Sequence, residues 1–439
     1  MVTFLSVLSI LTFFLLIFKF EWGLGFYLFY SFIFPYYVVY FGFFSIGTNL
    51  FSLIIIILFF VYSLRYKQKK KNLSLLSPFL FLFLSLGSLI LFHFSDEPIS
   101  YQLNVLRVDL MSILVPFAII NMTIIKNNTT QVLTKALYLS IGLSCIYGVF
   151  LLTIPGQNPY IDSIGWLIEY ESRDQDFVLE ENVRQFGYIS SFYTHVTQYG
   201  EFLIFSSVFL LYKIQNDGGR IPKILLALVI VNILFCGSRS VLLGEIAVIL
   251  SLLLLYRKFK TFFWGLVGIV VVIGIVLFIL PDYWLFILSI TDDTLAQGSS
   301  INLRFDQFIG CINSIKDNPL FGNGYGWTGW YRTTIGRHPV MLSFESSLIQ
   351  ILCDNGIVGL ALWVSMVVLI LKSIKLYFPK NIRVYTYVLL LLISYFFYTF
   401  FTGDYGGFRK MLIFYAIIVS NEIYFSSFEH KRNQSFNQI

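Results

Sequence analysis

Charged side chains are scarce in this chain of 439 residues. Asp, Glu, Lys and Arg make up only 12% of the residues, and hydrophobic residues make up 57%. A soluble domain carries about 25% charged residues. Stretches such as 224–235 and 262–280 contain no charge at all, and about 20 apolar residues suffice for a helix to cross a bilayer. The composition therefore excludes a water-soluble core of this length and predicts a protein that crosses the membrane many times.

Other common signals are also missing. Residues 1–23 lack a basic segment and a small-residue cleavage site, so we expect a retained helix there rather than a signal peptide. The four cysteines lack the spacing of a metal site. Cys145 and Cys236 fall in apolar runs and are expected to be packing residues, whereas Cys311 and Cys353 could either pair or stay free. No Walker loop or Rossmann fingerprint points to a nucleotide cofactor, and nucleic acid is not indicated as a partner.

Apolar segments predict about thirteen transmembrane helices, with 12 to 14 as the expected range. They fall near residues 2–20, 24–44, 48–64, 77–94, 104–122, 132–154, 198–213, 222–238, 240–256, 262–280, 356–374, 384–402 and 410–427. In lipid every backbone polar group needs a partner within its own segment, so helices are expected rather than open sheets. The predicted fold class is an all-α integral membrane protein.

Short basic loops set the predicted orientation, because Lys and Arg concentrate on the cytoplasmic side. Such loops occur at 65–71, 256–260, 372–383 and 429–434, and the segment 213–223, which includes Arg220, fits the same side. Two long loops, 155–197 and 281–355, then lie outside. The chain is thus divided into N-terminal helices (1–154), a first outer loop (155–197), central helices (198–280), a second outer loop (281–355) and C-terminal helices with a tail (356–439). Functional residues concentrate in loops on a rigid scaffold, so we expect the site outside.

The second outer loop contains a predicted helix and a glycine-rich turn. Apolar residues between 302 and 315 recur on one helical face. The stretch "DNPLFGNGYGW" follows, and Pro319 cannot continue a helix. Two interpretations remain open for the glycines. They could form a simple helix stop and loop, or a backbone cradle for a phosphate with Arg304 as its charge partner.

Three elements follow one another along the second half of the chain. They are "RQFGYISSFYTHVTQYGEFLIF" at 184–205, "GSRSVLLGEIAVIL" at 237–250, and Arg304 followed by "DNPLFGNGYG" and "FESSLIQILCDNGIVGL". In this order they resemble the O-antigen polymerase and O-antigen ligase superfamily. The resemblance covers roughly 184–410; earlier residues match only as hydrophobic helices. It implies a GT-C-like polytopic glycosyltransferase with two long extracytoplasmic loops that uses lipid-linked glycans.

One position separates the two branches of that superfamily. Ligases carry His where this chain has Glu345, usually followed by Asn, whereas Ser346 follows here. The acidic residue favours the polymerase branch. His338 lies seven residues earlier and does not align with the ligase histidine.

The chemistry expected of the site assigns roles to its charged residues. Arginine binds a diphosphate through paired, planar N–H donors, and Arg184, Arg239 and Arg304 are the candidates. Arg239 ends an apolar run, where snorkelling to the interface is the alternative. Glu345 is the first candidate for the general base and His338 the second. Possible substrate-contacting residues are Tyr325, Trp327, His195, Asp404 and Arg409, although Asp404 and Arg409 could simply pair and Trp327 could anchor the interface.

The resemblance also implies partners and a location. The donor and the acceptor would both be oligosaccharides linked to polyprenyl (undecaprenyl) diphosphate in the lipid bilayer. A chain-length regulator and a flippase of the same pathway are further expected partners. No metal or cofactor is needed in this scheme. The location would be the bacterial inner membrane, with the site on the extracytoplasmic side. Transfer to lipid A core, as in a ligase, and transport of polysaccharide remain the alternatives.

Overall fold

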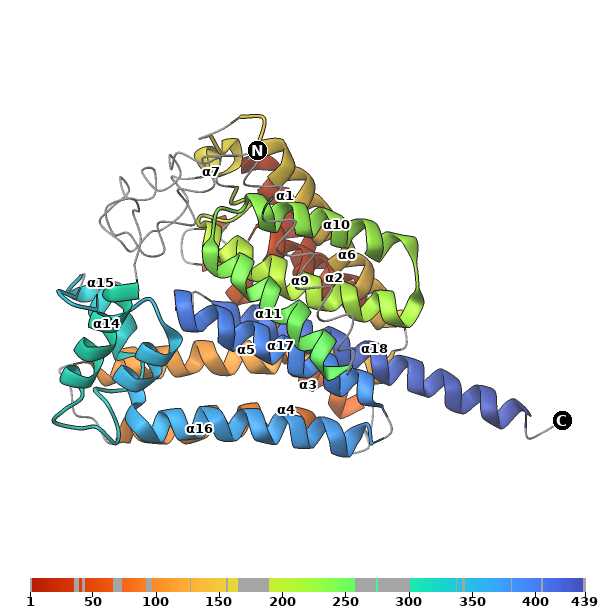
Figure 1. The fold of residues 1–439 in the computed structure, drawn as a ribbon. Helices are drawn as coiled ribbons and strands as arrows, with labels where there is room; N and C mark the ends of the chain where they lie inside the picture. Colours follow the sequence, from red (N-terminus) through yellow and green to blue (C-terminus); the bar gives the residue numbers. More distant parts are fainter. Residues whose placement is uncertain are drawn as a thin grey trace.

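The computed structural model is built almost entirely of helices (Figure 1). It describes residues 2–34, 39–41, 44–65, 73–91, 97–126, 128–154, 157–164, 189–256, 274, 301–336, 338–341, 344–379, 381–403 and 406–436. The first half contains α1 (Val2–Phe18), α2 (Phe20–Ile33), β1 (Val39–Phe41), β2 (Phe44–Ile46), α3 (Thr48–Arg65), α4 (Leu73–Ser88), η2 (Leu89–Leu91), α5 (Ile99–Ile125), α6 (Asn128–Leu151) and α7 (Pro159–Ile164). The second half contains α9 (Val196–Asp217), α10 (Arg220–Phe235), α11 (Arg239–Leu255), α14 (Ile301–Ser314), α15 (Trp327–Thr334), α16 (Ser347–Tyr377), α17 (Ile382–Thr402) and α18 (Gly407–Phe436).

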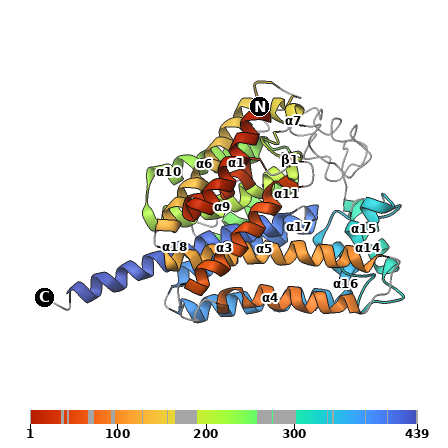
Figure 2. The same cartoon turned by 180° about the vertical axis from the view of Figure 1, so that it is seen from behind.

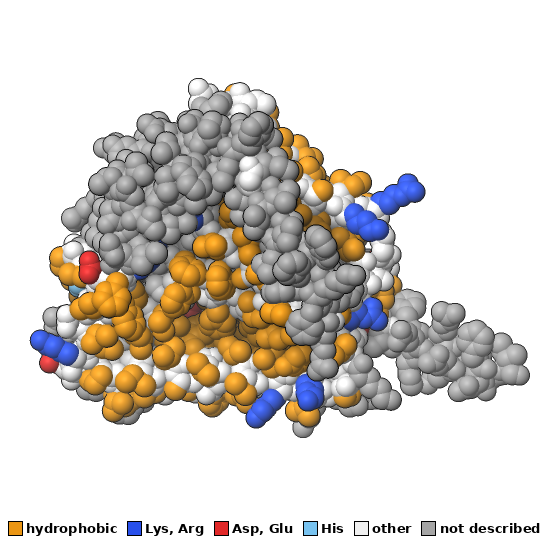
Figure 3. All heavy atoms as spheres, viewed as in Figure 1, with side chains coloured by type: hydrophobic (Ala, Val, Ile, Leu, Met, Phe, Trp, Pro, Cys, Tyr) orange, Lys and Arg blue, Asp and Glu red, His pale blue; other side chains and the backbone are white. Residues whose placement is uncertain are grey.

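Four of the described helices, α5, α6, α16 and α17, are long and apolar enough to cross a membrane. Shorter apolar helices occupy 4–18, 48–62 and 77–88. Hydrophobic side chains cover the middle of the face in Figure 3, and most of the visible Lys and Arg side chains lie toward its edges. This distribution suits a belt in contact with lipid. The chain is thus an all-α integral membrane protein, as its composition predicts.

The long helices pack side by side in pairs that are distant in sequence. α18 packs along α5, α16 along α4, α2 along α6, and α11 along α17. Both views place α14 and α15 at one end of α5 and α16, opposite the end from which the C-terminal part of α18 projects (Figures 1 and 2). The glycine-rich stretch of the sequence therefore belongs to a small cap over one end of the helical body.

Several buried polar groups link the helices of the body to one another. The Tyr199 hydroxyl donates to Oδ1 of Asn232 over 2.8 Å, and Nδ2 of Asn232 donates to the carbonyl oxygen of Cys145 over 3.2 Å. These bonds join α9, α10 and α6. Cys145 and Cys236 are both buried, in keeping with the packing role predicted for them.

The second predicted span differs from the observed structure. The apolar run 24–44 predicts one helix, yet α2 ends at Ile33 and β1 and β2 form a short antiparallel hairpin with Val39 opposite Ile46. Phe34 has φ −128° and ψ 51°, outside the helical region, as expected for a residue that precedes a proline. The aromatic and β-branched residues that follow also favour extended backbone. The predicted span 262–280 lies outside the described residues, apart from position 274.

Candidate functional site

Arg304 and Glu345 meet at the cap. Arg304 lies near the start of α14, and Glu345 lies in the loop that leads into α16. Nη2 of Arg304 is 3.0 Å from Oε2 of Glu345, and Nη1 donates to the Glu345 carbonyl oxygen. The guanidinium thus holds both the carboxylate and the backbone of the same residue. The side chains are 27% and 28% exposed, so the pair is accessible to a ligand.

An unusual backbone turn presents Glu345. Phe344 has a φ of +55°, which is uncommon for a bulky residue. The amide of Ser346 donates to the carbonyl oxygen of Phe344 over 2.8 Å, so the turn is closed around Glu345 itself. The Phe344 ring packs against Trp327 and Tyr331. Such strain persists where surrounding packing enforces it and is common at functional sites.

Helix α16 is broken after its first nine residues. Gly356 has φ +61° and ψ −157°, a conformation that is essentially restricted to glycine. The break removes the helical partners of the next amides. Ile357 N instead donates to the carbonyl oxygen of Pro319, and Val358 N to that of Leu320, both over 3.0 Å. The loop after α14 therefore supplies the acceptors that the helix lacks.

The same loop also satisfies the two carbonyl groups on the other side of the break. Asn323 N donates to the Cys353 carbonyl oxygen over 2.7 Å, and Gly324 N to that of Asp354 over 3.0 Å. A Cβ at Gly322 would lie 2.7 Å from the Cys353 carbonyl oxygen, so only glycine permits this approach. The phosphate-cradle interpretation is wrong for these two amides, because both are bonded to α16.

Two further side chains, Asp354 and Tyr325, hold the cap against α16 and α5. Neither contact is predicted by the sequence. Oδ1 of Asp354 accepts from the amide of Thr328 over 2.7 Å, at the start of α15. The Tyr325 hydroxyl donates to Oδ2 of Asp109 on α5. Burial, with Asp109 beside it, raises the pKa of Tyr325. Tyr325 is thus an anchor inside the fold rather than an exposed substrate contact.

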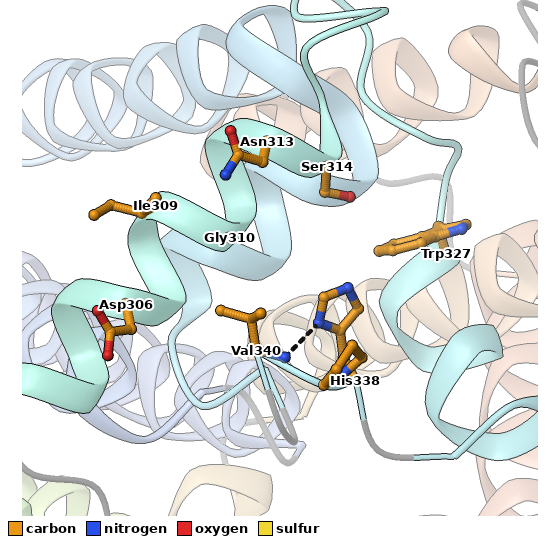
Figure 4. A pocket seen from close by; sticks show the side chains of 9 residues that line it. Asp306, Ile309, Gly310, Asn313, Ser314, Trp327, His338 and Val340 are labelled. Carbon is orange, nitrogen blue, oxygen red and sulfur yellow. Dashed lines mark hydrogen bonds between the residues drawn. The ribbon is translucent and has the colours of Figure 1, made fainter.

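A pocket of about 710 Å³ opens beside α14 (Figure 4). One wall is α14, Trp327 comes from α15, and His338 and Val340 come from the loop that follows. The lining combines a carboxylate, an amide, a hydroxyl, an imidazole and an indole, namely Asp306, Asn313, Ser314, His338 and Trp327, together with Ile309, Gly310, Pro339 and Val340. Polar groups beside a flat aromatic ring suit a ligand with hydroxyl groups and apolar faces, such as a sugar.

The hydrogen bonds of His338 determine which of its ring nitrogens carries the proton. Its Nδ1 accepts from the amides of Val340 and Met341 over 3.1 and 3.0 Å. A neutral imidazole with Nδ1 as acceptor carries its proton on Nε2. Burial lowers the pKa of His338, which favours this neutral form. The geometry therefore suits His338 for donation from Nε2 and makes it a poorer general base than Glu345.

Acidification is expected to destabilise the His338 loop. An unfolded histidine titrates at about pH 6.5, and the pKa in the folded protein is lower. The unfolded chain therefore binds the proton first, so the stability that is present above about pH 6.5 is lost as the pH falls through the lowered pKa. The apparent melting temperature in detergent should fall more between about pH 7.5 and 5.5 for the wild type than for His338→Asn, which keeps an acceptor and does not titrate. Equal losses would assign the effect to other groups.

The structure describes only one of the three other predicted residues Arg184, Arg239 and Asp404. Arg184 and Asp404 lie outside the described residues. Arg239 is the first residue of α11 and is half-buried. Its convergence with Arg304 on one ligand stays a prediction.

His195 and Arg409 have contacts within the helical body. Nδ1 of His195 accepts from the amide of Thr197 over 3.1 Å and so caps the N-terminus of α9. Nη2 of Arg409 donates to the hydroxyls of Tyr27 and Ser52 over 2.8 and 2.9 Å. These bonds tie α18 to α2 and α3, and they give both residues a structural role that is independent of substrate.

The helical body and the charged pair at its cap define a polytopic membrane protein with a polar site at one end. Residues 224–364 match a family described as O-antigen ligase. This range includes Arg239, Arg304 and Glu345, and the match supports the resemblance to the superfamily of O-antigen ligases and polymerases that the motifs indicate. It supports a membrane enzyme of ligase or polymerase type without separating the two branches. A search of curated proteins found no match.

Proposed function

We propose that this protein polymerises a polysaccharide at the outer face of the bacterial cytoplasmic membrane. It transfers a growing glycan from polyprenyl diphosphate to the terminal sugar of another lipid-linked repeat unit. The observation that carries this proposal is the two-point contact of Arg304 with Glu345, in the same cap that holds a pocket lined by groups that suit a sugar. Glu345 in place of the ligase histidine favours polymerisation over ligation.

Glu345 acts as the general base in this scheme. A hydroxyl oxygen of the acceptor sugar attacks the anomeric carbon of the donor, and the hydroxyl proton passes to the Glu345 carboxylate. The bond from the anomeric carbon to the diphosphate oxygen breaks, and the diphosphate leaves with the electron pair. Arg304 holds the carboxylate in position before the reaction, and in this scheme its guanidinium would also stabilise the negative charge that develops on the leaving diphosphate. Arg239, with Arg184, would hold the diphosphate.

The proposal is tested with purified protein in lipid nanodiscs and polyprenyl-diphosphate-linked repeat units from cells that make them. A polymerase forms a ladder of longer lipid-linked glycans from these units alone. A ligase, which is the runner-up because the family match does not exclude it, forms product only after a second acceptor such as lipid A core is added. The absence of any ladder under the first condition would overturn the polymerase proposal.

Arg239→Ala is expected to slow chain growth about 10- to 100-fold, because a charge-assisted hydrogen bond contributes about 1.5–3 kcal/mol. Arg220→Ala is a matched control: Arg220 is also the first residue of a helix, α10, and is exposed. Its predicted position is on the cytoplasmic side. An equal loss of rate in the two variants, or no loss in either of them, would remove Arg239 from the diphosphate site.

A further inference from the structure

We propose that Cys311 and Cys353 form a disulfide that fastens α14 to α16 in the cap that carries the Arg304–Glu345 pair. Their Sγ atoms are 3.4 Å apart, although 42 residues separate them along the chain. A disulfide bond is about 2.0 Å long, so a small movement of the two side chains brings the sulfur atoms to bonding distance. This inference concerns the cap itself and does not depend on which glycan the protein transfers.

The surroundings of the two thiols support a structural bond. Both side chains are fully buried, and the thioether sulfur of Met341 lies 3.7 Å from Sγ of Cys353. The site is therefore apolar and closed to soluble reductants once the cap is folded. In keeping with this, we expect oxidation to occur during folding, before α14 is fully packed against α16.

The position of the bond explains what it would stabilise. Cys311 lies two helical turns after Arg304 on α14. Cys353 precedes the break at Gly356, in the part of α16 that follows Glu345. A covalent link between these positions would hold the two elements that carry the charged pair at a fixed separation. It would also protect the loop bonds to the broken helix.

The chemistry requires an electron acceptor, which we infer to be an oxidised thiol–disulfide oxidoreductase of the outer compartment. The Cys311 thiolate attacks one sulfur of the oxidant's disulfide, and the oxidant's other sulfur leaves as a thiolate. The Cys353 thiolate then attacks the Cys311 sulfur and expels the oxidant. The two cysteines together lose two protons and two electrons, and the oxidant becomes a dithiol. Disulfides persist in such compartments and not in the cytosol. The proposal therefore requires the cap to face outward, as the basic loops predict.

Thiol counting on the full-length protein tests the proposal. Membranes are quenched with acid, and the protein is denatured, alkylated with N-ethylmaleimide and weighed by mass spectrometry, with and without prior reduction. The chain has four cysteines, so the expected result is two alkylated thiols without reduction and four after it. Cys145 and Cys236 are the internal controls, because each is packed in the helical body; Sγ of Cys236 lies 3.3 Å from the carbonyl oxygen of Val196.

The variant Cys353→Ala should show all three of its remaining thiols both before and after reduction. Four thiols in the unreduced wild type, or a reducible pair that persists in Cys353→Ala, would overturn the proposal. If the variant does not accumulate, peptide mapping of the wild type decides instead. The peptides that contain residues 311 and 353 should migrate as one linked species without reductant and as two with it, and separate peptides in both conditions would be the contrary result.

Discussion

Glu345→Gln is expected to lower the rate of chain growth by about 100- to 10,000-fold, the usual contribution of a general base. Glutamine has nearly the same size, and its carbonyl oxygen can still accept from Arg304, so the turn around residue 345 should survive. The amide cannot accept the acceptor's proton at neutral pH. Binding of the lipid-linked units should therefore change little while turnover is lost. The repeat-unit ladder assay in nanodiscs measures both quantities.

Asp317→Asn is the matched control, since it removes a carboxylate from the exposed turn that follows α14. We expect wild-type chain growth from it. His338→Asn serves as a second comparison, because His338 is the other base candidate from the sequence. Normal growth in Glu345→Gln together with loss in His338→Asn would reverse the roles assigned to these two residues. Normal growth in both would place the base elsewhere.

Gly356→Ala is expected to destabilise the protein by about 3–5 kcal/mol. An alanine at φ +61° and ψ −157° pays about 1–3 kcal/mol of backbone strain. Its Cβ would also lie 2.5 Å from the carbonyl carbon and oxygen of Leu320, and overpacking costs about 1–3 kcal/mol more. Backbone atoms cannot move aside as a flexible side chain would. The inserted loop would have to withdraw, and its four hydrogen bonds to α16 would be lost with it.

Gly218→Ala is a comparison in which a positive φ is tested without a steric contact. Gly218 ends α9 with φ +62° and ψ 4°, the left-handed helical region, which alanine enters at less cost than the conformation of Gly356, and a Cβ there would meet nothing within 4 Å. We expect a loss of about 1–2 kcal/mol from backbone strain alone. Apparent melting temperatures in detergent and accumulation in membranes measure the difference. Equal stability of the two variants would show that the loop tolerates a side chain at position 356.

The fold class and the position of the cap could be predicted from the sequence because both depend on local patterns. The scarcity of charge predicts membrane helices, and the apolar face between 302 and 315 predicts α14 almost to its ends. The hairpin formed by β1 and β2 was not predicted, since its residues are as apolar as a membrane helix. Hydropathy alone does not distinguish these conformations.

The glycine-rich stretch shows a different limit of sequence reasoning. A run of glycines indicates that something approaches the backbone closely, but it does not say whether that is a phosphate or another segment of the chain. Here the backbone of α16 makes the approach. Likewise, the resemblance marks Arg304 and Glu345 as important, yet their contact and the positive φ of Phe344 depend on tertiary packing.

The insertion of residues 319–324 into the break of α16 also constrains the length of this connection. A connecting loop normally accepts added or missing residues, but this one must keep its carbonyl and amide groups in register with both sides of the break. Engineering that relies on permissive loops, such as placing an epitope to map membrane sidedness, should therefore avoid it. The sequence of this segment is typical of a turn, but we expect it to accept inserted or deleted residues no better than the interior of a helix does.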